Sequence, residues 1–582
     1  MSKNPYFWLQ IYQFFTKFVT MTQQNALFLG WLCFFSLSAM AQSTFVPLHN
    51  WAYRTIDRIE IKSGQINDFV HTSVKPYLRV DVVSVAESPD EMVGIDFRSQ
   101  DRFNQFYVYK DNNEWTDWGL VKSKKPFLKY FYPYHADLVH IKDYSDFLLK
   151  INPVLYTELG MEANQKSLRY ENTRGIELRG MVSERLGFYA LLTENQSGFP
   201  SYVQEKNRNE EAVLGEGRYK DFVSRVGDSL FVRGVDYFGA RGYVTFQPME
   251  RVRVQFGHDK NFIGDGIRSL ILSDNSNSYL FLKLQTQVWK LQYQNLFMEL
   301  THQYRHDKDS LLTKKYAAIH HLSINLTKWL NVGISETVVF SRSNGFELQY
   351  LNPIIFYRAI EYHLGSPDNV LLAADWKANF LKRYSLYGQF VLDEFSFGEI
   401  SKGWWANKLA LQTGLKMVNT FGVNNLDSQI EYNMAMPYTY THNDAQANYT
   451  HYNQALAHPL GANFREILVS NNYRFKRYAN IKWNLLYAQQ GADIDSTNWG
   501  SNIFLDNTTH EQDYNNHLLQ GDKTNTFLSD LTFSYMWKHN FWFDINYRYR
   551  HSRSEQSLIL PMDTHYISGG VRWNIHRKEY LF

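Results

Sequence analysis

Apolar and polar residues alternate with a period of two through most of the chain after about residue 146. Because successive side chains of a strand point to opposite faces, this period predicts β-strands with one apolar and one polar face. Short polar connections join consecutive strands into hairpins. The clearest hairpin turns at Lys538-His539-Asn540, with Leu531, Phe533, Tyr535 and Trp537 before the turn and Phe541, Phe543, Ile545, Tyr547 and Tyr549 after it.

The length of these strands and their aromatic residues indicate that the apolar face meets a membrane. Each segment runs for about 10 residues, the length that a tilted strand needs to cross a bilayer. Tyr, Trp and Phe lie near the turns, as in the aromatic girdles of transmembrane barrels. The opposite face carries Asp544, Arg548 and Arg550, which a hydrated lumen accommodates and a soluble β-sandwich core accommodates only as pairs. We therefore predict an all-β protein, a transmembrane antiparallel β-barrel in the outer membrane of a Gram-negative bacterium.

Connection lengths predict the orientation and size of the barrel, since outer-membrane barrels have short periplasmic turns and long extracellular loops. At one strand and connection per roughly 24 residues, the region 146–582 gives about 16 to 18 strands. Short connections recur at 183–185, 247–250, 382–385, 476–480 and 538–540, and long polar stretches lie near 195–235, 258–278, 301–316, 398–406, 434–463, 489–527 and 551–563.

Residues 42–145 have a different pattern and are expected to form a small periplasmic subdomain with helices. After Asn50, a residue type preferred at helix N-caps, apolar residues recur at helical spacing as far as Gly64. Ser88-Pro89-Asp90-Glu91 has the spacing of a capping box with Pro at the first helical position, so a second helix is predicted to start there. The segment 77–83 between them is expected to be extended.

The first 41 residues have the pattern of a secretory signal peptide. An apolar run ends in Ala39-Met40-Ala41, the small-x-small pattern of a cleavage site. The sequence leaves both Met1 and Met21 open as the start, and an N-terminal membrane anchor is the alternative interpretation of the run. Cys33, the only cysteine, lies in this segment, so the mature chain is expected to contain no thiol and no disulfide.

Composition and charge exclude several other classes of protein. Aromatic residues make up 16% of the chain and yet the mean hydropathy is −0.42, because each apolar strand face is averaged with a polar one. The sequence lacks the several apolar runs of ~20 residues that a helical membrane protein requires. Lys and Arg number 60 against 58 Asp and Glu, without the basic cluster that a nucleic-acid-binding surface needs.

No motif in the sequence predicts catalysis, a cofactor or a metal site. Residues 259–270 resemble a calcium-binding loop but have Leu270 in place of its final Glu. His320 and His321 are adjacent, so a strand directs them to opposite faces and they cannot share a metal. The sequence also contains no Gly-x-Ser-x-Gly element. We expect a protein that is not an enzyme and has no cofactor.

A polar loop at 438–463 is the best candidate for a binding surface. Its Tyr residues offer rigid flat faces and its Asn, Gln and His residues offer adaptable hydrogen bonds, a mixture that suits a polyhydroxylated ligand. The alternative is that the loop has this composition in order to stay hydrated, or that its side chains serve local packing. The candidate polysaccharide-binding residues are Tyr438, Tyr440, His442, Tyr449, His451, Tyr452, His458 and Asn463, together with Arg268 as a cationic contact for an acidic sugar.

Four blocks of the sequence are distinctive: Phe256–Ser273, Tyr350–Asn369, Leu386–Glu394 and His458–Asn463. Together they resemble the Wzi-type capsule-assembly family, and the last block has the form found in Bacteroidota relatives. The resemblance implies an outer-membrane barrel of about 18 strands with a small periplasmic helical portion. It also implies a lectin-like role, in which the protein holds secreted polysaccharide at the cell surface.

The leading hypothesis is therefore an outer-membrane barrel that binds surface polysaccharide and helps attach or assemble a capsule or exopolysaccharide. The expected partners are outer-membrane lipid, the polysaccharide and the barrel-assembly machinery, for which Tyr580-Leu581-Phe582 provides a terminal aromatic signal. Nucleic acid is not an expected partner, and the barrel is expected to be monomeric. The alternatives are a porin-like diffusion channel and an outer-membrane component associated with gliding motility or secretion.

Overall fold

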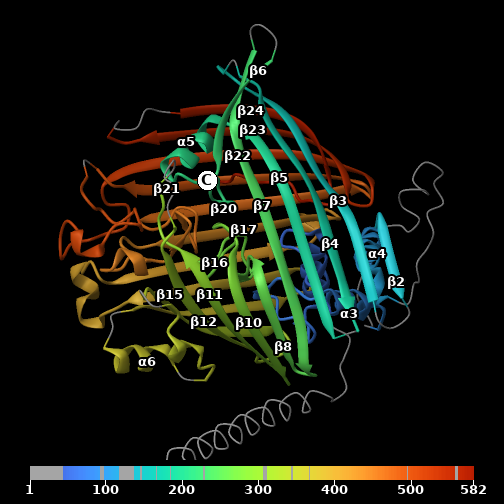
Figure 1. Ribbon diagram of the computed structural model, residues 1–582, viewed down its shortest axis with the longest axis horizontal. Coiled ribbons are helices and arrows are strands. Elements are labelled where there is room, and N and C mark those ends of the chain that lie inside the picture. The colour runs from blue at the N-terminus through green and yellow to red at the C-terminus, as the bar shows by residue number, and fades with distance from the viewer. Residues whose placement is uncertain are drawn as a thin grey trace, which may run out of the picture.

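The chain folds into a closed antiparallel β-barrel of 18 strands with other parts of the chain inside it (Figure 1). The predicted fold is confirmed, with a strand number at the upper end of the predicted range. The predicted signal peptide and Cys33 lie outside the residues that the structure describes. The computed structural model describes residues 43–582 except 92–96, 117–136, 144–146, 166, 184, 227–229, 306–310, 343–344, 355, 366–367, 495 and 557–561.

Each barrel strand pairs with its neighbours along the chain, and the ring closes between the last strand and the first, where Trp573 lies opposite Leu155. Two shorter strands, β2 (Val139–Asp143) and β6 (Lys220–Val226), pair with β3 and β7. The ring strands are β3 (Phe147–Glu162), β4 (Arg169–Val182), β5 (Leu186–Gly198), β7 (Leu230–Met249), β8 (Val252–Asp259), β10 (Tyr279–Val288), β11 (Leu291–Thr301), β12 (Lys314–Asn325), β13 (Leu330–Phe340), β14 (Asn369–Phe380), β15 (Tyr384–Glu394), β16 (Lys408–Met417), β17 (Leu426–Ala435), β20 (Phe464–Lys476), β21 (Ala479–Ala492), β22 (Asp522–Lys538), β23 (Phe541–Ser554) and β24 (Met562–Trp573).

The five short connections predicted from the sequence all fall at hairpin turns, and strand direction puts them at the same end of the barrel. The long connections lie at the other end, on the left in Figure 1. We call these the short-turn end and the long-loop end.

Side chains on the two faces of a strand have opposite surroundings. On β23, Ile545 is 59% exposed on the outer face, whereas Arg548 on the inner face is 1% exposed. The apolar residues thus face outward and the polar residues face the lumen, the reverse of a soluble protein and the arrangement expected in lipid. The predicted facing of Asp544, Arg548 and Arg550 into the lumen is correct, but their expected hydration is wrong. Arg548 pairs with Asp530 at 2.6 Å and Asp544 with Arg572 at 2.6 Å, because other parts of the chain fill the lumen.

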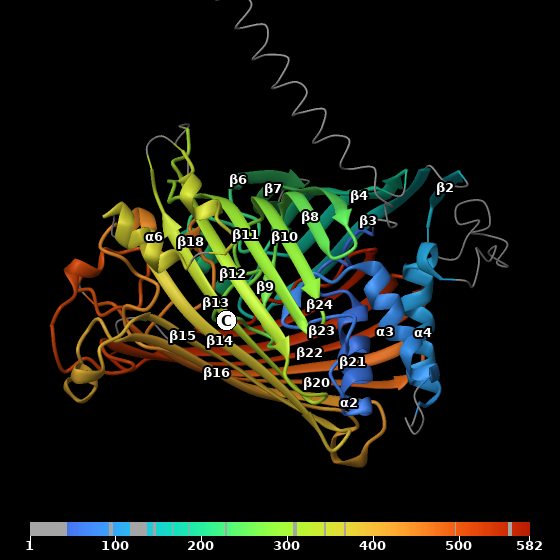
Figure 2. The same cartoon turned by 90° about the horizontal axis from the view of Figure 1, so that it is seen from below.

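Three helices at the short-turn end form a small bundle, visible in blue in Figure 2. They are α2 (Trp51–Ser63), α3 (Arg79–Glu91) and α4 (Ser99–Asp111), and they share a core that includes Ile56, Val82 and Val108. The predicted boundaries of α2 are correct: the side-chain oxygen of Asn50 accepts from the amide of Ala52 at 2.9 Å, and Gly64 ends the helix with φ 70°. We call this bundle, together with the other described residues between 43 and 116, the plug.

The predicted helix start at Ser88 is wrong, as is the extended conformation predicted for most of 77–83. Helix α3 begins at Arg79 and contains Pro89 in its last turn. Packing of its valines on α2 and α4 outweighs the local capping pattern. The carbonyl of Val85, which Pro89 cannot serve because it has no amide hydrogen, accepts instead from the hydroxyl of Ser88 at 2.8 Å.

The remaining helices and strands are short. None of the described helices has the length and apolar character needed to cross a membrane. These elements are β1 (Val74–Lys75), η1 (Asn113–Trp115), α5 (Ser201–Asn209), β9 (Phe262–Ile263), η2 (Leu348–Leu351), α6 (Tyr357–Leu364), η3 (Phe397–Lys402), η4 (Thr420–Gly422), η5 (Ala445–Ala447), β18 (Thr450–His451), β19 (Gln454–Ala455) and η6 (Asn507–Thr509).

The C-terminal tail after β24 turns into the lumen instead of continuing the sheet (Figure 1). The Tyr580 hydroxyl donates to Glu171 at 2.8 Å, and the Phe582 carbonyl accepts from Arg550 at 2.9 Å. The terminal aromatic residues therefore lie inside the barrel, beside its wall, and not in its last strand.

Candidate functional site

The connection 436–463 between β17 and β20 enters the lumen from the long-loop end. Within it, β18 and β19 form a two-residue hairpin in which Thr450 lies opposite Ala455. Tyr440 and Tyr449 stack at 5.7 Å, and both join an apolar cluster with Leu270, Leu272 and wall residues of several strands. We call this connection the inner loop.

The hydroxyl groups of the two stacked tyrosines are bonded inside the protein. Tyr440 donates to the carbonyl of Leu270 at 2.8 Å, and Tyr449 donates to the carbonyl of Ile271 at 2.6 Å. Burial raises the pKa of both tyrosines, so both remain neutral donors. These side chains fasten the inner loop to the connection 260–278, which also lies in the lumen.

All three candidate histidines, His442, His451 and His458, lie within hydrogen-bonding distance of other groups of the protein. His451 Nδ1 accepts from the amide of Thr301 at 2.9 Å, so Nε2 carries the proton and donates to the carbonyl of Ser278 at 3.2 Å. Burial lowers the pKa of His451 to about 3, which keeps this neutral form. His442 Nδ1 accepts from the amide of Asp444 at 3.1 Å.

His458 and Arg268 meet on one carboxylate. His458 lies 3.0 Å from Glu466 Oε1, and Arg268 donates to both oxygens of Glu466 at 3.2 Å. Glu466 belongs to the barrel wall, whereas the other two come from separate connections. Because this carboxylate neutralises Arg268, the guanidinium is not a free cation for an acidic sugar.

Asn463 joins three segments at the point where the inner loop returns to β20. Its side chain donates to the carbonyls of Gly491 and Gln520 at 2.8 and 2.9 Å, and accepts from the amide of Leu519 at 2.7 Å. Its φ is 54°, a left-handed conformation that Asn tolerates better than most residues. Asn463 thus ends the inner loop and also bonds it to the connection between β21 and β22.

Tyr438 and Tyr452 also contact the chain itself. The Tyr438 hydroxyl donates to the carbonyl of Asn498 at 2.9 Å. The Tyr452 ring packs edge-on against Tyr304 at 4.9 Å and lies close to Gly217.

Most of the candidate residues are buried, as local packing of the loop would require. Seven of the nine are buried, while Tyr452 and Arg268 are half-buried. Hydrogen bonds to other segments satisfy their polar atoms, so water is not needed around them. One sequence signal favours burial: Asp444 is the only charged residue between 438 and 463, which also contain five alanines. Contact between these nine residues and polysaccharide stays a prediction.

The inner loop, the connection 260–278 and the plug form one continuous filling of the lumen. The amide of Ser273 donates to Leu456 in the inner loop at 2.9 Å, and the amide of Gly264 donates to Ser73 in the plug at 2.6 Å. In addition, β1 of the plug pairs with β9. The filling therefore extends from one end of the barrel to the other.

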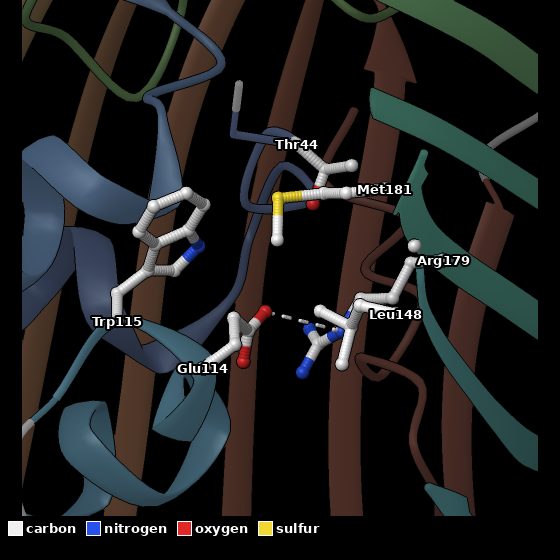
Figure 3. A pocket seen from close by; sticks show the side chains of 7 residues that line it. Thr44, Glu114, Trp115, Leu148, Arg179 and Met181 are labelled. Atoms are coloured by element: carbon white, nitrogen blue, oxygen red, sulfur yellow. Dashed lines mark ion pairs between the residues drawn. The ribbon is translucent and has the colours of Figure 1, made fainter. Parts of the chain in front are cut away.

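Ion pairs join the plug to the barrel wall. Glu60 of α2 pairs with Lys377 of β14 at 2.6 Å, and Arg54 pairs with Asp427 of β17 at 3.0 Å. Figure 3 shows side chains of the plug and of the wall that line a narrow crevice, among them Glu114, Trp115 and Arg179. There Glu114 approaches Arg179 of β4 at 3.7 Å. The surfaces that meet in the lumen are thus complementary in charge.

Two other connections at the long-loop end carry exposed aromatic side chains that the sequence analysis did not select. The amide of Trp405 donates to the carbonyl of Asp513 at 2.9 Å, and its indole stacks on His510 at 4.2 Å. Trp404 beside it is half-buried, and Tyr514 is 45% exposed. We call the pair of connections 395–407 and 493–520 the outer layer. The adjacent tryptophans Trp404 and Trp405 in a polar stretch were the available signal.

Gly403 allows the two connections to meet. Its φ is 61°, and a Cβ there would lie 2.7 Å from the carbonyl oxygen of Asn516. The amide of Asn516 donates to the carbonyl of Gly403 at 2.9 Å, and that of Asn515 donates to Lys402 at 2.9 Å. Backbone bonds therefore hold the outer layer in one conformation. Among the described residues, no group of three or more His, Cys, Asp or Glu is placed to hold a metal ion.

Comparison with known proteins gives a family match and several structural matches. The family model described as capsule assembly protein Wzi matches residues 203–559. No curated protein matches the chain.

Among solved structures, the chain is similar to Wzi of Escherichia coli, with a TM-score of 0.55 and 13% identity over 92% of this chain and 100% of that one. That protein is described as an outer membrane protein involved in group 1 capsule assembly and as a carbohydrate-binding β-barrel. OprD of Pseudomonas aeruginosa matches with a TM-score of 0.39 and 9% identity over 73% of this chain and 94% of that one. OccAB2 of Acinetobacter baumannii matches with a TM-score of 0.41 and 8% identity over 73% and 97%.

The closed barrel with its apolar outer wall, together with the family match, defines an outer-membrane β-barrel protein. The chain belongs to the Wzi capsule assembly family. In such barrels short turns are periplasmic and long loops extracellular, so the periplasmic position of the plug and the extracellular position of the outer layer remain predictions.

Proposed function

We propose that the protein binds a surface polysaccharide at its extracellular end and helps attach or assemble a capsule or exopolysaccharide. Membership of the Wzi capsule assembly family supports this function. The observation that carries it is the outer layer, a rigid arrangement of aromatic and amide side chains above a filled lumen. A filled lumen favours a binding surface over a diffusion channel.

The outer layer has the chemistry that sugar recognition requires. Trp404 and Tyr514 present flat faces against which the C–H face of a pyranose stacks, and such rings lose little conformational entropy on binding. Trp405 packs edge-on against Trp404 at 6.3 Å and is itself stacked on His510. Asn515, which is exposed beside Tyr514, offers an amide for sugar hydroxyls. Of the nine residues selected from the sequence, Tyr438 contacts Trp405 at 6.1 Å and so supports the outer layer in this proposal.

The protein acts in this proposal as a binding and attachment factor, without catalysis. Its partners are the polysaccharide, outer-membrane lipid and, during biogenesis, the barrel-assembly machinery, and its working form is a monomer. Since Phe582 lies in the lumen, assembly would require recognition before the tail takes up this position.

The test compares outer-layer variants with a matched control. Trp404→Ala and Tyr514→Ala should each weaken binding of purified surface polysaccharide to the reconstituted protein, since an aromatic contact of this kind contributes about 1 kcal/mol, or roughly fivefold in affinity. Trp289→Ala removes a tryptophan that is 74% exposed in a short periplasmic turn, and it should leave binding unchanged. Equal binding by all three variants, or a deletion strain that keeps a normal capsule, would contradict the proposal.

A further inference from the structure

The connection between β13 and β14 lies against the outer wall of the barrel and not over its mouth. It spans 341–368 and contains η2 and α6. Figure 2 shows α6 on the outside of the ring of strands. Tyr350, Tyr357 and Ile360 of this connection pack on the outward-facing side chains Phe297, Tyr316, Ala318, Val338, Phe340 and Val370 of strands β11 to β14.

The wall beneath this connection carries polar side chains that face outward. Asn295, His320 and Glu336 lie opposite one another on β11, β12 and β13. The neighbouring His321 points into the lumen, where it lies 2.7 Å from Asp375. Because side chains alternate along a strand, His320 and the residues paired with it must face outward. The next residue in this row is Leu372 on β14, which is exposed on the same face.

Such a row would be unfavourable in contact with lipid, because hydrocarbon offers no hydrogen bonds to polar groups. The connection supplies what lipid does not. The carboxylate of Glu336 accepts from the amides of Tyr357 and Arg358 at 2.7 and 2.9 Å, at the N-terminus of α6. The His320 ring lies 3.9 Å from the Tyr357 ring. The polar row is thereby removed from the surface.

The outer face of the same connection is apolar to a degree unusual for a water-exposed loop. Ile354 is 84% exposed, Phe356 72%, Tyr362 84% and Leu348 73%. Arg358, which is also exposed, pairs with Glu361 at 2.8 Å. The segment thus combines large apolar side chains with a basic residue, as interfacial membrane helices do.

We propose that residues 346–354 and 356–364 lie in the outer leaflet of the outer membrane and take the place of the barrel wall as its lipid-contacting surface there. The occupant of the apolar face is the acyl chains of the membrane lipid. This face is continuous with the lipid-facing wall, since Leu372 and Ile334 flank the covered row and are themselves exposed.

The inference is tested with single cysteines that carry a fluorophore, in a background where Cys33 is replaced by Ser. Ile354→Cys, Phe356→Cys and Tyr362→Cys place the fluorophore on the apolar face. The labelled proteins are reconstituted into vesicles of phosphatidylethanolamine and phosphatidylglycerol, with a nitroxide on the acyl chain as lipid-borne quencher and iodide as aqueous quencher.

Two further positions calibrate the measurement. Leu372→Cys reports a side chain on the lipid-facing wall, and Phe397→Cys reports an exposed side chain of the extracellular connection that contains η3. We expect positions 354, 356 and 362 to lose fluorescence to the acyl-chain nitroxide as position 372 does, and to resist iodide. Quenching by iodide as at position 397 would overturn the proposal, because the face would then meet water. Protection from both quenchers would also overturn it, because a second copy or another protein would then cover the face.

Discussion

Lys377→Met tests the ion pairs that hold the plug in the barrel. Lys377 and Glu60 are 3% and 2% exposed and lie 2.6 Å apart, so the variant leaves a carboxylate buried without its cation. Loss of one partner of a buried pair typically costs about 3 to 5 kcal/mol. If that cost falls on the docking of α2, the equilibrium constant for its local opening rises about 10² to 4 × 10³-fold, at 1.4 kcal/mol per factor of ten.

Hydrogen exchange of the α2 amides in detergent-solubilised protein measures this opening directly. The protection factors across 51–63 should fall by the same factor, while those of strands far from the plug should change little. Lys476→Met removes an exposed lysine at the last position of β20, at the short-turn end, and serves as the matched control.

A double variant separates the charge effect from a loss of packing. Glu60→Gln with Lys377→Met removes both charges but keeps a side-chain oxygen that can accept from the amide of Asn67. In the native protein the Glu60 carboxylate accepts this hydrogen bond at 2.9 Å. Asp265, 3.7 Å from Lys377, keeps its bond from Thr72 at 2.6 Å. The double variant should therefore recover part of the lost protection. A single variant that resembles the Lys476→Met control, or a double variant less protected than the single one, would refute the reasoning.

Three further predictions concern the filled lumen. Burial lowers the pKa of His451 to about 3 from an ordinary 6.5. The stability that the neutral ring contributes is therefore present above pH 6.5 and is lost as the pH falls toward 3, by up to about 1.4 kcal/mol per pH unit. Hydrogen exchange of the inner-loop amides should show this slope, and His451→Gln should flatten it. Asn463→Ala should lower the unfolding free energy by about 3 kcal/mol through three lost hydrogen bonds, and further because alanine is unfavourable at a positive φ. Asn463→Gly should lose the same hydrogen bonds but avoid this backbone cost. Equal thermal shifts of the two variants would contradict the prediction. The purified protein should show no steady conductance in planar bilayers, and the large conductance typical of an open barrel of this size would contradict a filled lumen.

The barrel was predictable because the alternation of side chains is a local property of each strand. Ile545 faces lipid and Arg548 faces the lumen because the two residues are an odd number of positions apart on one strand. The boundaries of α2 were predictable as well, since Asn50 and Gly64 act on the residues next to them. The start of α3 was not, because its position depends on the packing of valines against two other helices.

The candidate site was predictable only in part. Composition identified 438–463 as distinctive, but tyrosine and asparagine suit a wet surface and a polar interior equally well. Whether the Tyr440 hydroxyl meets water or the carbonyl of Leu270 depends on a segment 170 positions away in the chain. The exposed aromatic residues of the outer layer depend likewise on the meeting of two distant connections at Gly403 and Asn516.

The sequence alone determined that this is a membrane barrel of about this size, with short turns at one end and long loops at the other, because these properties follow from residue period and spacing. Only the tertiary structure decided where the polar connections go. It brings Glu60 to Lys377, and the connection before Asn369 to the outer wall, across separations that no local pattern records. The buried carboxylates at these two places, Glu60 and Glu336, are tolerated because each has a specific partner. The closed barrel brings these partners into position.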